Sequence, residues 1–463
     1  MYVYDLYNSN LLKNISNEYS EYEKNIINQT YGLCSDCKEP KTFWGWCKSC
    51  NSKRFQMAFQ WTSGNGIIDK IIKDSQLTAR NKREVIEWIP YDRLKNIQFH
   101  ARGGFSTVYL AIWLDGRIRT YWNNETNQLD RKVFKLNEED FKNARNKETR
   151  SPLQKNEKTG FHVVLKCLNN SSNDTEGFLN EWKNYLKFIY STMNNNCDSI
   201  RLYGITQDPV TLDYMIVMEY MSYGSLRSNL MIKKYNPYDK FNNLYFIARS
   251  LSALHKCGLI HGDFHSGNIL LQSHRYAYIS DFGLSRSAHK SDSNEVYGVL
   301  PYIAPEVLRG KPYTKASDIY SFGIIMWEMT SGIPAFNNVP HDFYLSIGIC
   351  KGNRPEIIDD TEPEYVELMK KCWDSEPNKR PSAEDLIECF KKMRSQYYSN
   401  YDRVQVPENE VIIQNHPLSC YTSRKINYST ELNEILKSSE SSESLEHCRV
   451  NEVDYLYPVR GSV

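Results

Sequence analysis

The spacing of hydrophobic and polar positions changes within residues 94 to 395. In the first part, apolar residues form short runs rich in Val, Ile, Tyr and Phe, as in FSTVYLAIW, FHVVLKCL and YMIVMEYM, which favour β-strands. In the second part they recur at helical spacing, as in KASDIYSFGIIMWEM and EPEYVELMKKCW. Strands followed by helices predict an α+β domain of two lobes, one strand-rich and one helical.

Four further regions differ from this domain in composition. Residues 1–30 are polar, residues 31–55 carry a cysteine cluster, and residues 56–93 have helical spacing in GIIDKIIKD and EVIEWI, which predicts a partly helical connector. Residues 396–463 are polar and include the acidic, serine-rich SSESSESLEH. Because so little apolar surface cannot offset the entropy of ordering it, we expect a disordered C-terminal tail.

Charge and targeting signals narrow the class of protein. The 57 Lys plus Arg nearly cancel the 56 Asp plus Glu, so charge gives no argument for a nucleic-acid or membrane partner. The first twenty residues lack the basic region and apolar stretch of a signal peptide, and no run of eighteen apolar residues occurs. These features predict an intracellular protein, cytoplasmic or nuclear, whose oligomeric state the sequence leaves open.

A glycine-containing loop lies between two of the predicted strands, in HARGGFSTVY. Glycine allows backbone N–H groups to approach phosphate oxygens without obstruction by a Cβ atom. A tight turn between strands needs Gly-Gly for conformational reasons about as often, so this loop alone does not identify a phosphate site.

Lys166 and Glu181 form a second candidate pair. Lys166 ends the apolar run VVLK, and Glu181 lies in the helically spaced GFLNEWKNYLKF. A buried lysine must find an anion, and a helix carboxylate can hold it while it reaches a phosphate. The alternative for Lys166 is a strand-end lysine whose ammonium group lies in water.

Three oxygen-bearing side chains occur in HGDFHSGNIL and SDFGLSR, namely Asp263, Asn268 and Asp281. Phosphoryl transfer needs a carboxylate near the accepting hydroxyl and oxygen ligands for magnesium. The chain contains no GxxxxGK[ST] loop, and its DFG follows the apolar run YAYIS. This combination favours phosphoryl transfer outside the P-loop class.

The ordered motifs, ending in APE at residues 304–306, resemble the eukaryotic protein kinase signature set. GVLPYIAPEVL and CWDSEPNKRP are similar to tyrosine-kinase-like kinases, whose members mostly phosphorylate serine and threonine. The resemblance implies a two-lobe kinase fold, with an antiparallel sheet and one helix in the N-lobe. It further implies an ATP- and Mg²⁺-dependent enzyme (Mn²⁺ could substitute) that acts on protein serine, threonine or tyrosine hydroxyls in intracellular signalling.

The resemblance also assigns roles to residues. Asp263 would act on the acceptor hydroxyl, Lys166 and Glu181 would pair, and Asn268 and Asp281 would hold Mg²⁺. The positions implied for ATP binding are Ala101, Arg102, Gly103, Gly104, Phe105, Ser106, Val108, Val164, Lys166, Met218, Glu219, Tyr220, Met221 and Leu270.

Structural roles follow from the same resemblance. Tyr185, His261 and Phe282 would stack into an apolar column between the lobes. Asp318 would hold the backbone of the loop that carries Asp263. Arg380 would pair with Glu306 of the APE motif.

Several positions depart from the family pattern. Ala101 and Ser106 replace loop glycines, and Val164 replaces an alanine beside the adenine, which could weaken nucleotide binding. Gly262 replaces the arginine that usually meets a phosphate in the loop after Asp281, and His265 replaces a common lysine. An active serine/threonine kinase, a tyrosine or dual-specificity kinase, and a pseudokinase or scaffold with weak nucleotide binding therefore all remain open.

Residues 114–160 exceed a normal strand connection and predict a surface insertion, whose aromatic stretch RTYWNNE could pack locally or bind a partner. CSDC and CKSC lie nine residues apart, which predicts tetrahedral Zn²⁺ held by Cys34, Cys37, Cys47 and Cys50 in a module similar to a short zinc ribbon. A disulfide or redox pair is the alternative. Trp44 and Trp46 are expected to cover this site.

Overall fold

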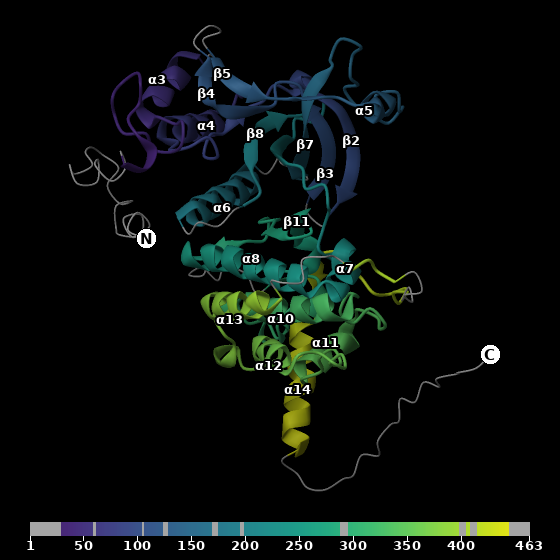
Figure 1. Cartoon of the computed structure of the whole chain (residues 1–463). Coiled ribbons are helices and arrows are strands. Elements are labelled where there is room, and N and C mark those ends of the chain that lie inside the picture. Colours follow the sequence, from purple (N-terminus) through teal and green to yellow (C-terminus); the bar gives the residue numbers. More distant parts are fainter. Residues whose placement is uncertain are drawn as a thin grey trace.

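The chain folds into a strand-rich lobe above a helical lobe, as the computed structural model shows (Figure 1). The structure describes residues 29–58, 62–103, 106–123, 128–168, 175–194, 199–287, 295–397, 404–407 and 414–443. This architecture confirms the two-lobe α+β fold expected from the sequence pattern.

The N-lobe is built on one sheet, in the spatial order β1-β8-β9-β7-β3-β2, with β6 paired to β7 outside this path. All neighbours in the path are antiparallel except β1 and β8, which are parallel. Its long strands are the apolar runs of the sequence, whose side chains form a buried core that includes Leu165 and Val217. The strands are β1 (Glu87–Trp88), β2 (Leu94–Arg102), β3 (Ser106–Trp113), β6 (Phe134–Lys135), β7 (Thr159–Leu168), β8 (Leu202–Gln207) and β9 (Tyr214–Glu219), and helix α6 (Thr175–Asn194) follows β7.

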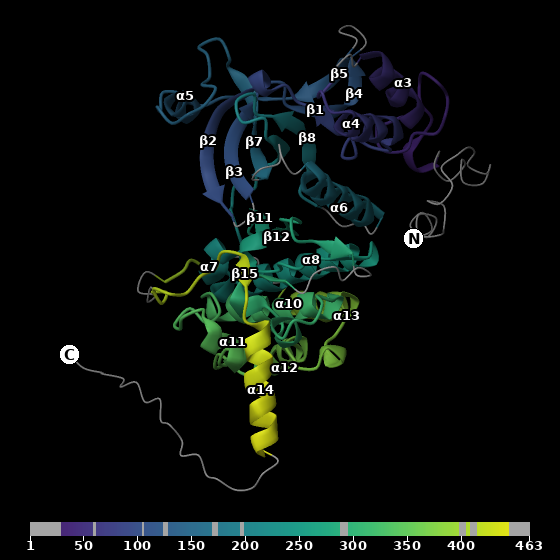
Figure 2. The same cartoon turned by 180° about the vertical axis from the view of Figure 1, so that it is seen from behind.

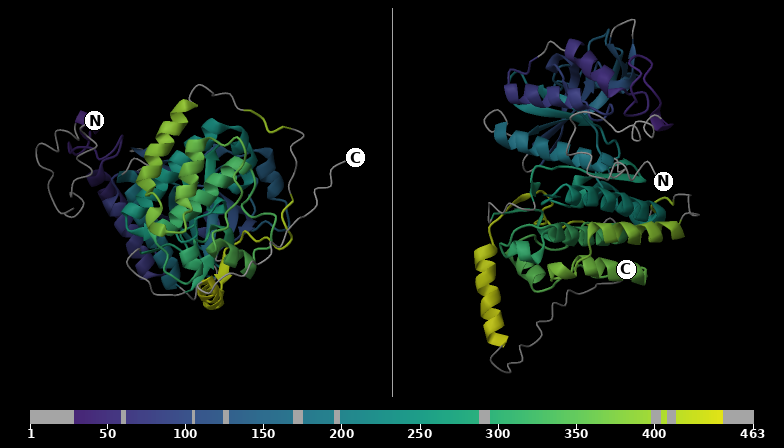
Figure 3. Two further views of the ribbon diagram at one scale, coloured as in Figure 1. Left: turned by 90° about the horizontal axis from the view of Figure 1, so that it is seen from below. Right: turned by 90° about the vertical axis from the view of Figure 1, so that its left-hand side faces the viewer.

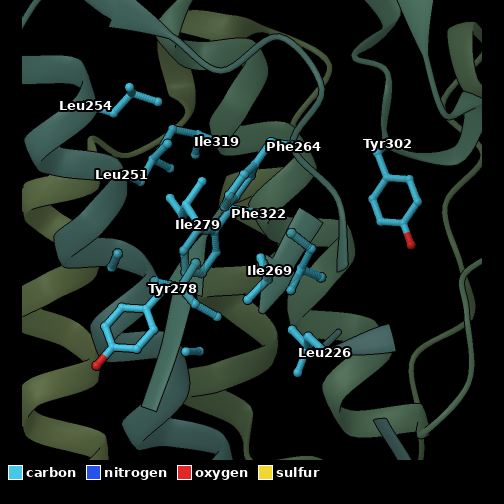
Figure 4. Close-up of a cluster of buried hydrophobic side chains, with 14 of the residues drawn as sticks. Leu226, Leu251, Leu254, Phe264, Ile269, Tyr278, Ile279, Tyr302, Ile319 and Phe322 are labelled. Carbon is cyan, nitrogen blue, oxygen red and sulfur yellow. The ribbon is translucent and has the colours of Figure 1, made fainter. Parts of the chain in front are cut away.

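The C-lobe is helical, and α10 (Lys315–Ser331) lies in its interior. Thr314 and Ser317 form a capping box at its start, and Gly332 ends it in the left-handed conformation, with φ +82°. Figure 4 shows Leu251, Phe264 and Phe322 among the side chains gathered in the core beside it. The other helices are α7 (Leu230–Tyr235), α8 (Pro237–Lys256), α9 (Pro305–Leu308), α11 (Phe343–Cys350), α12 (Pro363–Cys372) and α13 (Ala383–Gln396).

Two short strand pairs lie in the C-lobe below the N-lobe sheet. The hairpin β11 (Ile269–Ser273) with β12 (Tyr276–Ile279) directly follows the loop that contains Asp263 and Asn268. The pair β10 (Leu259–Ile260) with β13 (Arg286–Ser287) brackets the same loop and Asp281. The two pairs therefore hold the polar residues of both sequence motifs at the end of the C-lobe that faces the N-lobe.

The insertion has a structure of its own, made of the hairpin β4 (Arg117–Asn123) with β5 (Gln128–Lys132) and helix α5 (Glu138–Asn143). Asn137 and Asp140 form a capping box at the start of α5, and Asn96 of β2 donates a 2.6 Å hydrogen bond to the Asp140 carbonyl. The insertion therefore packs on the N-lobe. The side chains of RTYWNNE from residue 120 onward lie outside the described residues.

The cysteine module packs on the N-lobe through α3 (Lys48–Ala58) and the connector helix α4 (Gly66–Thr78). Trp46 is fully buried against Phe55, Val85 and Ile118, and its indole donates a 3.0 Å hydrogen bond to the Ala79 carbonyl. Trp44 differs from the expectation, because it is 64% exposed and does not cover the cysteines as a buried side chain would.

Residues near the C-terminus form a strand and a helix, β15 (Arg424–Ile426) and α14 (Ser429–Glu443), against the C-lobe (Figures 2 and 3). β15 pairs antiparallel with β14 (Val296–Gly298). Ile426 and Leu432 are buried in the C-lobe core, and Asn433 exchanges hydrogen bonds with Arg309. The expectation of a disordered tail is therefore wrong for residues 414–443, because these apolar and backbone contacts anchor them.

Candidate active site

The loop that carries Asp263 is fixed from below by Asp318 of α10. The Asp318 carboxylate accepts backbone hydrogen bonds from His261 at 2.9 Å and Gly262 at 3.1 Å, as well as one from the His255 ring at 2.9 Å. Gly262 has a φ of +75°, a conformation that glycine adopts without steric cost. The anchoring contact predicted for Asp318 is thus confirmed.

Asp263 is buried and hydrogen-bonded on one side only. Asn268 Nδ2 donates to its backbone carbonyl at 3.0 Å and to Oδ2 at 3.3 Å. Within the described residues Oδ1 accepts no hydrogen bond. Burial raises the pKa of this carboxyl, but His265 and the Ser423 hydroxyl lower it by more, so the pKa lies below its ordinary value. Asp263 is therefore an ionised carboxylate whose Oδ1 accepts no hydrogen bond from the part of the chain that the structure describes.

His265 presents an N–H group toward Asp263. Its Nδ1 accepts a 3.0 Å hydrogen bond from the Gly267 backbone, so the proton of the neutral ring resides on Nε2. Nε2 lies 3.6 Å from Asp263 Oδ1 and 3.4 Å from the Ser423 hydroxyl. The His265 ring and the Asp263 carboxylate therefore both face the Ser423 hydroxyl.

Lys166 reaches across the lobes to Asp281. Its ammonium group, on β7, lies 2.8 Å from Asp281 Oδ1. Burial raises the pKa of Asp281, but Lys166 lowers it by more, so this carboxyl too has a pKa below its ordinary value. Ser280, the residue before Asp281, donates from its backbone N–H and its hydroxyl to the Asn268 carbonyl at 2.8 and 2.9 Å, which brings Asp281 beside the loop that carries Asp263. The side chain of Glu181 lies outside the described residues.

An apolar column stands behind this pair. The Phe282 ring is fully buried, with its centroid 4.9 Å from the Tyr185 ring and 5.5 Å from the His261 ring. The predicted stack of these three rings is confirmed. Tyr185 comes from α6, so the column joins the two lobes at the site.

The described residues predicted to bind nucleotide in the N-lobe lie on or between four neighbouring strands. On β7, Val164 pairs with Met218 of β9, while Lys166 pairs with Val108 of β3. Ala101 lies opposite Val108, at the end of β2. Gly103 closes the turn between β2 and β3 by a 2.8 Å hydrogen bond to the Ser106 carbonyl. Gly104 and Phe105 lie outside the described residues.

Most of the remaining residues predicted to bind nucleotide lie at or just after the end of β9. Glu219 ends β9, and Tyr220 and Met221 continue from it, Met221 being buried. Leu270 of β11 forms a bridge with Ser225 just beyond them. The predicted set therefore surrounds the junction between the lobes on both sides.

The four module cysteines lie together and form no disulfide. Their Sγ atoms are all within 4.8 Å of one another, with Cys34 to Cys50 at 3.7 Å and Cys37 to Cys47 at 3.5 Å. Zn–S bonds of about 2.3 Å place tetrahedral sulfur ligands about 3.8 Å apart. The spacing therefore fits a four-coordinate zinc ion.

Sequence reasoning missed one side chain that contacts the site from the C-terminal segment. The Ser423 hydroxyl donates a 2.5 Å hydrogen bond to Asp263 Oδ2. It lies 160 residues from that carboxylate in the sequence, in a stretch with no motif. The spacing of Ile426, Leu432 and Leu436 was the only signal that this region packs on the protein.

Comparison with known proteins agrees with this geometry. A family model for protein tyrosine and serine/threonine kinases matches residues 135–390, which are 256 of the 463 residues. The chain belongs to this family.

Curated relatives are themselves named as kinases. A probable serine/threonine-protein kinase of Dictyostelium discoideum is 29% identical over 248 residues, 50% of this chain and 18% of the relative. A putative serine/threonine-protein kinase/receptor of Acanthamoeba polyphaga mimivirus is 36% identical over 174 residues, 37% of this chain and 10% of the relative. A serine/threonine/tyrosine-protein kinase of Arabidopsis thaliana is 32% identical over 187 residues, 39% of this chain and 47% of the relative. The chain thus spans less than half the length of these relatives.

Among the described residues, no helix has the length and apolar character required to cross a membrane.

Proposed function

We propose that this chain is an ATP-dependent protein kinase that transfers the γ-phosphate of ATP to serine and threonine hydroxyls of proteins. The observation that carries the proposal is the convergence of Lys166, Asp281, Asp263 and Asn268 at the junction of the lobes. These groups supply the cation, the carboxylates and the amide that phosphoryl transfer requires.

Each side chain has a distinct task in this proposal. Asp263 orients the acceptor hydroxyl and takes its proton, since its ionised carboxylate already accepts a hydrogen bond from a serine hydroxyl, that of Ser423, at Oδ2. Lys166 holds phosphate oxygens of ATP while Asp281 keeps it in place. Catalysis then rests on positioning and on charge neutralisation.

Asn268 and Asp281 fit the magnesium that the family uses. Because Asn268 Nδ2 donates to Asp263, its Oδ1 is the atom suited to a cation, and Asp281 adds carboxylate oxygen. When bound, Mg²⁺ offsets the negative charge of the phosphates.

Transfer of labelled γ-phosphate from ATP to a mixed set of serine, threonine and tyrosine peptides, with Mg²⁺, tests the proposal. Asp263→Ala should abolish transfer. Asp359→Ala, an exposed aspartate on the same lobe, is the matched control and should retain it. Equal transfer by the wild type and Asp263→Ala would reject catalysis by this site and favour the pseudokinase alternative. The ratio of serine and threonine to tyrosine products tests the specificity.

We propose further that the cysteine module binds one structural zinc ion. The four thiols fill a tetrahedral set and leave no open position for chemistry. The burial of Trp46 beside Ile118 of the insertion supports a role in fixing the module to the N-lobe.

A further inference from the structure

The C-terminal segment, residues 414–443, crosses the proposed acceptor site. At its centre the Ser423 hydroxyl donates to Asp263 Oδ2 at 2.5 Å, and His265 Nε2 lies 3.4 Å from the Ser423 hydroxyl oxygen. Ser423 therefore faces both the carboxylate and the imidazole of the site. The hydroxyl occupies the place, relative to the carboxylate, that an acceptor must occupy for its proton to be removed.

The backbone that follows Ser423 is held as a strand. Arg424, Lys425 and Ile426 pair antiparallel with Gly298, Tyr297 and Val296 of β14. Gly298 itself lies beside the carboxylate, since a Cβ atom added there would be 3.4 Å from Asp263 Oδ1. The pairing of β15 with this edge therefore brings Ser423, the residue just before β15, to the proposed base Asp263.

Side chains on both flanks fix the register of the segment. Before Ser423, Tyr421 donates to the Ala335 carbonyl at 2.9 Å, and Arg227 donates to the Tyr421 carbonyl at 2.9 Å. After Ser423, Lys425 forms an ion pair with Glu295, and Ile426 is buried in the C-lobe core. A one-residue slip would expose Ile426 and break these contacts. The observed register therefore places Ser423, and not the residue on either side of it, at the Asp263 carboxylate.

Thr422 provides the contrast. It is an exposed hydroxyl residue directly before Ser423, whereas Ser423 is half-buried. Two adjacent hydroxyl groups thus differ in exposure, and Ser423 is the one on the carboxylate.

We propose that Ser423 is an intramolecular phosphorylation site of this protein, presented to Asp263 by its own C-terminal segment. This inference rests on the proposed kinase activity. The Ser423 oxygen attacks the γ-phosphorus of ATP, the new O–P bond forms, and the bond from the γ-phosphorus to the bridging oxygen of ADP breaks. ADP leaves with that electron pair, and the hydroxyl proton passes to Asp263.

The product would not stay in the site. Phosphoserine adds a charge near −2 beside Asp263 and Asp281, which repel it. Until that step, the segment occupies the acceptor position. Phosphorylation of Ser423 therefore releases the C-terminal segment from the acceptor site and leaves that site open to other proteins.

The experiment uses the full chain, freed of phosphate by phosphatase, incubated with Mg²⁺ and ATP and mapped by phosphopeptide mass spectrometry. Phosphate should appear on Ser423, and Ser423→Ala should lose it while Thr422→Ala keeps it. The fraction modified per unit time should not change over about a hundredfold range of chain concentration, because the acceptor is tethered to its own site.

A serine peptide added to the same reactions separates this inference from the proposed function. Ser423→Ala should still phosphorylate the peptide. Peptide phosphorylation without phosphate on Ser423 would overturn the inference and leave the kinase assignment intact. A rate on Ser423 that rises in proportion to chain concentration would overturn it as well, by showing transfer between molecules. Failure to phosphorylate either acceptor would overturn the proposed function, and the inference with it.

Discussion

Arg380 and Glu306 form a two-armed ion pair inside the C-lobe, with the two guanidinium nitrogens 2.7 and 2.8 Å from the two carboxylate oxygens. The Arg380 side chain has no exposed surface, and a third hydrogen bond runs from it to the Ala316 carbonyl at 2.9 Å. The pair fastens the APE segment to the start of α10. The contact expected from the family resemblance is therefore confirmed.

Glu306→Gln should be strongly destabilising. It leaves the buried Arg380 charge without its counter-ion, a change that costs about 3–5 kcal/mol in comparable buried pairs. Chemical denaturation followed by fluorescence measures the free energy of unfolding. Lys392→Met breaks an exposed pair with Glu364 and should leave stability unchanged. Equal effects of the two variants would contradict the structural role of the buried pair.

The sequence predicted those parts of the site whose chemistry is carried by short motifs. The resemblance to the kinase motifs assigned roles to Asp318, Asp263 and Asp281, and the structure brings the three residues around one loop. The strand and helix periods likewise predicted the two lobes. In both cases the information is local, so a linear reading can recover it.

The sequence did not predict the contacts that depend on distant surfaces. Ser423 lies in a polar stretch, and its position at Asp263 depends on pairing between β15 and β14 across the lobe. Trp44 and Trp46 look alike in the sequence, but only Trp46 meets the N-lobe, through Ala79 and Ile118. Tertiary packing decides which of two neighbouring residues of the same type becomes buried, and short-range sequence patterns do not encode that packing.

Removal of zinc should loosen the cysteine module. We expect one zinc per purified chain by elemental analysis, and a lower melting temperature after chelation, because structural zinc contributes folding free energy. Cys47→Ser should lose the metal. Cys389→Ser, a half-buried thiol far along the chain on α13, should keep one zinc. A chain with no zinc and unchanged melting after chelator treatment would refute the site.

Because of Gly262, we expect that kinase activity does not require phosphorylation of the segment between Asp281 and Glu306. The family arginine that would meet a phosphate there is replaced by a residue without a side chain. Because phosphatase also acts on Ser423, the comparison uses Ser423→Ala, whose turnover of an added peptide should be the same before and after phosphatase treatment. Loss of turnover on treatment would contradict this.

His341 makes docking of the C-terminal segment sensitive to pH. Its Nδ1 lies 3.0 Å from the Cys420 backbone nitrogen and 2.9 Å from the Cys420 carbonyl oxygen, and its Nε2 lies 3.0 Å from the Phe336 carbonyl oxygen. Burial lowers the pKa of His341 below 6.5, and the charges of Arg424 and Arg227, the cations that face it, lower it further. The Tyr421 ring packs on its other side. The neutral ring is thus the docked form.

Stability supplied by His341 should fall as the pH drops below 6.5. Below pH 6.5 His341 is protonated in the unfolded chain but still neutral in the folded chain. The free energy of unfolding therefore falls with decreasing pH until the pH reaches the lowered pKa of His341 in the folded state. The melting temperature of the wild type minus that of His341→Gln, measured from pH 8 to pH 5, should therefore shrink toward acid. A constant difference over this range would show that His341 does not titrate with docking.

Tyr421→Ala should open the acceptor site to other substrates. The ring lies 5.1 Å from the Arg227 guanidinium, and its hydroxyl donates to the Ala335 carbonyl. Together these contacts are worth about 1–2 kcal/mol, so the equilibrium constant for docking of the segment should fall about 5- to 30-fold. Both forms carry Ser423→Ala, so that phosphorylation cannot release the segment. Because the segment and an added serine peptide compete for one place, the KM for the peptide should decrease in the form that also carries Tyr421→Ala.

The other kinetic constants distinguish this release from damage to the site. The kcat at saturating peptide and the KM for ATP should stay unchanged in Tyr421→Ala, since the catalytic groups and the nucleotide residues are untouched. Tyr421→Phe is the matched control, because it keeps the ring over Arg227 and loses only the hydroxyl, so its KM for the peptide should decrease less. A KM for the peptide that is the same in Ser423→Ala with and without Tyr421→Ala would show that the segment does not compete with substrates for the acceptor position.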